Sequence, residues 1–134
     1  MIGLDTNVVV RFLTRDDEAQ FKRALSAIQA ARRAQESLFI GIPVLLETVW
    51  VLQRAYGVDR NGVAKTIHGL LESSDLVLEH EALVEAALDA FQTGSADFAD
   101  YVIGLGNLAA GCRHTLTFDD QAARFAAFKT VRAS

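Results

Sequence analysis

Hydrophobic residues along this chain fall into short apolar runs and longer segments with one apolar side. Short apolar runs bounded by polar or turn residues predict buried strands. They cover residues 2–4, 38–42, 76–78 and 115–118, and residues 128–131 predict a last edge strand. The chain therefore begins with a strand, and the first polar side chain after that strand is Asp5.

Segments in which apolar residues recur every three or four positions predict helices between these strands. A short amphipathic helix follows Asn7 directly, longer helices cover about 17–35, 44–56, 59–73, 80–93 and 97–111, and a short one follows residue 120. Pro43 suits a first helical turn, where no partner is needed for a backbone N–H, and Gly57 ends that helix.

Strands that alternate with helices imply a parallel sheet with right-handed crossovers. The expected fold class is α/β with three layers, a central parallel sheet of four to five short strands and helices on both faces. The 134 residues are expected to form a single domain over 1–134. A chain of this length buries about two-thirds of its unfolded surface.

Composition and charge exclude several classes of protein. Cys112 is the single cysteine, which excludes an internal disulfide and a multi-cysteine metal site and favours a reducing, cytoplasmic compartment. We expect no signal peptide and no membrane span, because Met1 runs straight into a strand and the later apolar runs are interrupted. The net charge of −4 argues against nucleic acid held by overall charge, but is compatible with a local basic patch.

Two carboxylates follow predicted strands directly. Asp5 ends the first strand, and Asp119 ends the fourth in the same apolar-then-acid pattern. Carboxyl ends of parallel strands lie at one edge of a sheet, where ligands of open α/β sheets bind. Asp119 has an alternative role as a helix cap, for which Asp120 competes.

Three further acids lie near predicted helix starts. Glu47 interrupts an apolar helix that we expect to be buried on most faces, where an unpaired carboxylate is costly. Its alternative is a dipole-favoured Glu or a partner of Arg54. Asp97 and Asp100 share one helix face. The alternative to a role in the site is that Asp97 caps the helix and Asp100 is an acid favoured in its first turn.

Helices that follow parallel strands begin at the same sheet edge as the strand ends, so these acids are predicted to converge. Converging carboxylates repel and remain ionised together only with bound cations. Oxygen ligands without His or Cys favour Mg²⁺ or Mn²⁺ over zinc. Such a site suits phosphodiester hydrolysis by an activated water, which agrees with the absence of a plausible nucleophilic triad in the sequence.

Four short motifs in this order resemble the PIN-domain nucleases, most closely the VapC-type toxins of bacterial toxin–antitoxin pairs. They are Asp5-Thr6-Asn7, Glu47 within its apolar helix, Asp97-Phe98-Ala99-Asp100-Tyr101-Val102-Ile103, and Thr117-Phe118-Asp119. No single motif is specific, but the four in order cover essentially the whole chain.

The resemblance implies a PIN-like fold and a metal-dependent endoribonuclease toxin, a homodimer that a cognate antitoxin masks. The four family acids fall on Asp5, Glu47, Asp100 and Asp119, which would hold Mg²⁺ or Mn²⁺, and Asp97 matches an extra acid of some members. Polar positions that orient carboxylates or water fall on Thr6, Asn7 and Thr117, and for Asn7 ordinary turn chemistry is an equal alternative.

Two arginines near the predicted site and three alternative functions remain to be considered. Arg11 and Arg15 lie near the predicted site and are candidates for contact with RNA phosphates or an acidic antitoxin segment, against a plain solvated face. A haloacid-dehalogenase-like phosphatase would need an Asp two residues after the first, where Asn7 stands. A receiver domain would need a late-strand Lys, and Lys129 is too near the end. A PIN-like module that only binds a partner is the non-enzyme alternative.

Overall fold

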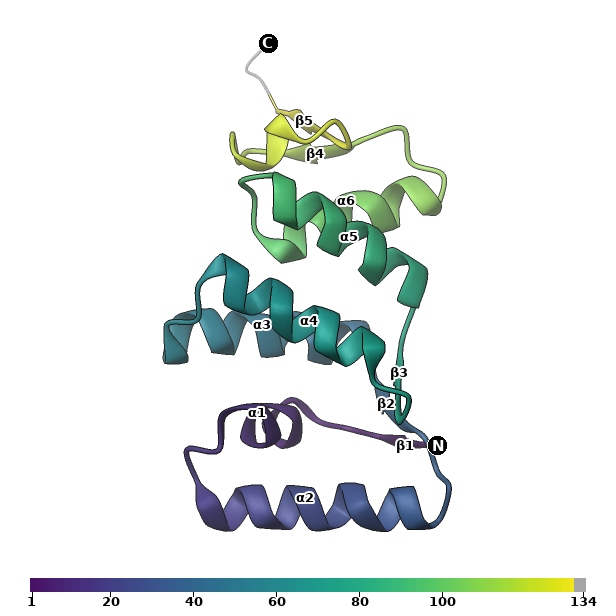
Figure 1. Ribbon diagram of the computed structural model, residues 1–134. Helices are drawn as coiled ribbons and strands as arrows, with labels where there is room; N and C mark the ends of the chain where they lie inside the picture. The colour runs from purple at the N-terminus through teal and green to yellow at the C-terminus, as the bar shows by residue number, and fades with distance from the viewer. Residues whose placement is uncertain (132–134) are drawn as a thin grey trace. The chain divides into compact units, whose positions relative to one another are not determined.

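Five short strands and six α-helices make up the described part of the chain, residues 1–131, in a computed structural model (Figure 1). They divide between an N-terminal unit, residues 1–81, and a C-terminal unit, residues 82–134. Every pair of neighbouring strands is parallel. The predicted mixed α/β class with short parallel strands is therefore confirmed.

The N-terminal unit contains a three-stranded sheet in the order β1-β2-β3. Its register pairs Ile2 with Leu38, and Leu38 with Leu76. Helix α1 packs against both α2 and α3, and α3 runs beside α4 (Figure 1). The elements are β1 (Ile2–Gly3), α1 (Thr6–Thr14), α2 (Glu18–Arg33), β2 (Leu38–Ile40), α3 (Ile42–Tyr56), α4 (Arg60–Glu72) and β3 (Leu76–Leu78).

Local hydrogen bonds explain why these helices begin and end where they do. The Asp17 side chain accepts from the backbone N–H of Gln20 and so caps α2, and Asp59 caps α4 through the N–H of Gly62. Gly57 ends α3 in the left-handed region at φ 63°, which a residue without Cβ adopts at little cost. The predicted ends of these helices are confirmed to within two residues.

Aliphatic side chains from α1, β2, α3 and α4 are buried in the N-terminal unit; they include Val9, Val10, Ile40, Leu45, Leu52, Val63 and Ile67. Strand β1 differs from its prediction as a buried strand, since both of its residues are exposed. It is an edge strand of the three-stranded sheet and has a partner strand on one side. No helix among residues 1–131 is both long and apolar enough to cross a membrane.

The C-terminal unit is built from two helices and a two-stranded parallel sheet. Phe91 and Phe98 meet edge to face at 5.8 Å between ring centroids, and Tyr101 meets Phe125 at 5.0 Å. Such aromatic pairs stabilise a small core beyond the area that they bury. The elements are α5 (Glu81–Thr93), α6 (Phe98–Ala109), β4 (Thr115–Thr117), the 3₁₀ turn η1 (Ala122–Arg124) and β5 (Phe128–Thr130).

Candidate active site

Asp5 lies between the end of β1 and the start of α1. It is exposed, and its Oδ1 accepts a 2.8 Å hydrogen bond from the backbone N–H of Thr6, which makes it the cap of α1. Within residues 1–131, no hydrogen bond is made by its Oδ2. Asp5 therefore combines capping with a free carboxylate oxygen at the carboxyl end of a strand.

Each candidate site acid of the N-terminal unit, Asp5 and Glu47, is followed in the sequence by a threonine whose hydroxyl is buried. Thr6, after Asp5, is 5% exposed, and Thr48, after Glu47, is 1% exposed. Among the described residues neither Oγ1 atom has a hydrogen-bond partner. A buried hydroxyl left unpaired costs about 1–3 kcal/mol, so each is a group that a bound water or ligand could satisfy.

Glu47 is exposed on α3, on the one stripe of this helix that is not packed, so its own expected burial is not observed. The buried face of α3 consists of Leu45, Thr48, Val49 and Leu52. Trp50 is exposed as well, and Arg54 lies 5.7 Å from the centre of its ring. Within the described range Glu47 forms no ion pair with Arg54, so that alternative is not supported.

Asp97 and Asp100 open helix α6 together. Asp97 is the N-cap, and its backbone N–H donates to Asp100 Oδ2 at 3.2 Å in a capping-box arrangement. Burial raises the pKa of Asp100; the backbone N–H of Asp97 opposes this, and the negative charges of Asp97 and Asp119 raise the pKa further. The Asp100 side chain is half-buried at this helix start.

Asp119 follows β4 and is held at both its main chain and its side chain. Its backbone N–H donates to Thr117 Oγ1 at 3.0 Å. Its Oδ1 accepts from the backbone N–H groups of Gln121 at 2.8 Å and Ala122 at 3.3 Å. The Asp119 carboxylate thus accepts from two backbone N–H groups at the start of the short η1 turn, and Thr117 contacts the main chain of Asp119 as a positioning residue would.

Within the C-terminal unit, the charges of Asp97 and Asp119 thus both act on the Asp100 carboxyl. Across residues 1–131, no group of three or more His, Cys, Asp or Glu side chains stands close enough to hold a metal ion. Electrostatic repulsion extends beyond coordination distance, so the two observations are compatible. Carboxylate oxygens without His or Cys are the kind of ligand that a hard cation such as Mg²⁺ or Mn²⁺ prefers.

A comparison with protein-family models matches the PIN domain over residues 2–128. The chain belongs to the PIN family. PIN domains generally are metal-dependent nucleases, and the matched range includes residues of both units of this chain. No curated protein and no solved structure gave a significant match to the sequence.

Placed on this PIN domain, the predicted acids divide between the units. Asp5 and Glu47 belong to the N-terminal unit, and Asp97, Asp100 and Asp119 belong to the C-terminal unit. Their convergence on one centre stays a prediction. The local roles of Thr48 and Tyr56 could not be derived from the sequence. The one available signal was for Thr48, a polar residue at an inward helical position.

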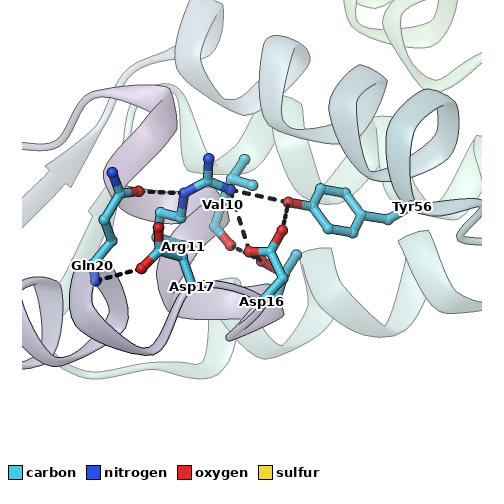
Figure 2. Close-up of polar contacts among 7 residues, drawn as sticks. Val10, Arg11, Asp16, Asp17, Gln20 and Tyr56 are labelled. Carbon is cyan, nitrogen blue, oxygen red and sulfur yellow. Dashed lines mark hydrogen bonds and ion pairs between the residues drawn. The ribbon is translucent and has the colours of Figure 1, made fainter.

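The two predicted contact arginines both have partners within the N-terminal unit. Arg15 lies 4.1 Å from the centre of the Phe21 ring and 3.5 Å from Glu18. Arg11 donates to Gln20, Tyr56 and Asp16 (Figure 2). Arg15 is thereby a structural side chain of the α1–α2 turn, whereas Arg11 is fixed in place and keeps one nitrogen free of these bonds.

Proposed function

We propose that this PIN domain is a metal-dependent endoribonuclease that acts as the toxin of a toxin–antitoxin pair. Membership of the PIN family supports the nuclease class. The resemblance of the acidic motifs to VapC-type toxins supports the toxin role, a cognate antitoxin as partner, and a homodimer in the cytoplasm.

The observation that carries the nuclease proposal is the match to the PIN family over residues 2–128, together with the pairing of Asp97 and Asp100 at the start of α6. Carboxylates that repel one another without a compensating cation destabilise the fold, and a divalent ion removes that cost. We propose that Asp5, Glu47, Asp100 and Asp119 hold one or two Mg²⁺ or Mn²⁺ ions, with Asp97 in support.

The chain's own residues would then position water and substrate. A bound Mg²⁺ or Mn²⁺ would lower the pKa of a water molecule and offset the negative charge of the scissile phosphate. A carboxylate of the four-acid set accepts the proton from the attacking water. Thr6 and Thr117 orient that set, one through its unpaired hydroxyl and one through the main chain of Asp119.

The experiment that tests this proposal is cleavage of a mixed RNA pool by the purified protein. We expect cleavage with Mg²⁺ or Mn²⁺, none in EDTA and none by the Asp5→Asn variant. Asn also caps helices well, so this variant keeps the bond to Thr6 that starts α1. Its matched control is Asp59→Asn, which exchanges the cap of α4 and is outside the acid set.

Metal-dependent cleavage that the Asp59→Asn control retains and the Asp5→Asn variant loses would establish the nuclease. The second candidate function is a PIN-like module that only binds a partner. It is favoured by the exposed and unpaired position of Glu47, which no local contact within the described residues holds for catalysis. Equal cleavage by wild type and Asp5→Asn would contradict our assignment of the site.

A further inference from the structure

A hollow with a volume of about 380 Å³ lies between α1 and α2 of the N-terminal unit, and four of its seven lining residues carry polar or charged side chains. We call it the α1–α2 groove. Its small apolar side chains are Val8, Ala24 and Ala27, and its lining also includes Asn7, Arg11, Gln20 and Arg23. The polar lining therefore offers guanidinium and amide groups and no carboxylate.

Arg23 is the free cation of this groove. It is exposed on α2, and over residues 1–131 its side chain has no ion pair or hydrogen bond. A guanidinium in this state presents all of its N–H donors and its full charge to a ligand.

Arg11 is the second cation of the groove, and it is held in place. Its Nε donates to Gln20, and its Nη1 donates to the Tyr56 hydroxyl at 3.0 Å and to Asp16 at 3.3 Å. Figure 2 shows the remaining nitrogen directed away from both Tyr56 and Asp16. A side chain fixed in this way loses little further freedom when a ligand binds. Since Asp16 offsets its charge, Arg11 contributes mainly hydrogen bonds.

The groove begins beside the candidate catalytic residue of this unit. Asn7 lines it and is two residues after Asp5. Asn7 and Arg11 are one helical turn apart on α1, which separates them by about 6 Å along the axis. The polar groups thus extend from the neighbourhood of Asp5 along the first helix.

We propose that the α1–α2 groove binds a single strand of the RNA substrate, with Arg23 and Arg11 contacting its phosphates. The inference rests on the proposed function, from which it takes RNA as the ligand. Arginine and amide side chains are usual contacts to the phosphates of a nucleic-acid backbone. A partner helix would instead need a groove that receives large apolar side chains. The apolar side chains of this groove are only the small ones of Val8, Ala24 and Ala27.

The test measures binding without cleavage. A labelled single-stranded oligoribonucleotide is titrated in EDTA with the full chain, the Arg23→Gln variant and the Arg33→Gln variant. Arg33 is exposed on the same helix but does not line the groove, so it is the matched control for charge. We expect Arg23→Gln to weaken binding roughly tenfold and to lower the salt dependence by about 0.7 in log–log slope.

Equal affinity and equal salt slope for Arg23→Gln and Arg33→Gln would overturn the inference. It would also be overturned if Arg23→Gln kept RNA affinity and lost binding to an acidic peptide, because the groove would then be a protein site. Thermal unfolding checks that both variants fold.

A second readout separates this inference from the proposed function. Bis(4-nitrophenyl) phosphate is a small phosphodiester whose hydrolysis with Mn²⁺ needs the four-acid set. It is too short to occupy the α1–α2 groove, so the Arg23→Gln substitution should leave the rate of this hydrolysis unchanged. RNA binding that depends on Arg23 without any metal-dependent hydrolysis would support the groove and contradict the nuclease. Metal-dependent hydrolysis, with RNA binding that does not depend on Arg23, would support the nuclease and contradict the proposed role of the groove.

Discussion

The Tyr56 hydroxyl donates a 2.6 Å hydrogen bond to Asp16 Oδ2, which joins the last residue of α3 to the turn between α1 and α2. Arg11 donates to both groups (Figure 2). Thr14 Oγ1 donates to Asp16 Oδ1 at 3.1 Å. One carboxylate thus collects donors from three side chains. These hydrogen bonds link Arg11 of the α1–α2 groove to helix α3 of the N-terminal unit.

The Tyr56→Phe substitution should raise the pKa of Asp16. The Tyr56 hydrogen bond is the largest cause that holds this pKa below its ordinary value of 3.8, and burial opposes it. A lowered pKa stabilises the fold above pH 3.8, and that contribution is lost as the pH falls through the lowered value. The variant should therefore show a smaller loss of stability in acid. NMR titration of the Asp16 carboxyl carbon measures the shift, and an unchanged titration would contradict the role of Tyr56.

The Asp5→Ala substitution should destabilise the fold by about 1 kcal/mol, because Ala does not cap the N–H of Thr6. Asp5→Asn keeps a capping oxygen and should remain within a few tenths of a kcal/mol of wild type. Both variants should lose RNA cleavage. Urea unfolding beside a cleavage assay separates the cap from the catalytic role, and equal stabilities of the two variants would contradict the capping assignment.

The Asp100→Asn substitution should stabilise the protein at neutral pH in EDTA. Burial is the largest cause that raises the pKa of Asp100, with the charges of Asp97 and Asp119 in addition. An acid whose pKa is raised by folding destabilises the fold as the pH rises from 3.8 through the raised value. Wild type and variant should therefore converge below pH 3.8. Thermal unfolding across pH measures this, and a variant less stable at neutral pH would be the contrary result.

The Thr48→Val substitution should stabilise the fold by about 1 kcal/mol, since it removes a buried hydroxyl that lacks a partner. Thr6→Val removes the other such hydroxyl and should bring a similar gain in stability. The two should differ in activity, because Thr6 follows Asp5 and is proposed to orient the acids or water. We expect slower RNA cleavage from Thr6→Val and unchanged cleavage from Thr48→Val. Slower cleavage by Thr48→Val alone would reverse these assignments.

How far the sequence predicts the fold can be judged from the helix ends. The Gly57 end of α3 and the Asp97 start of α6 are where the pattern indicated. These features depend on hydrogen bonds between residues only a few positions apart. Hydrophobic periodicity likewise depends on neighbours along one helix, so the order of elements could be derived from the sequence.

The positions of Glu47 and of Tyr56 could not be derived in that way. An apolar sequence around Glu47 predicted burial, but the packing of α3 leaves this residue on the exposed face. The Tyr56–Asp16 contact joins residues 40 positions apart. Both depend on which helices pack together.

By itself the sequence determined the α/β class, the approximate helix boundaries and the match to the PIN family. The tertiary structure alone decided which side chains are buried, which groups hold Arg11, and why the pKa of Asp100 is raised. The physical reason is range. Capping and periodicity act between near neighbours, whereas burial and electrostatic repulsion depend on residues that the sequence separates and folding brings together.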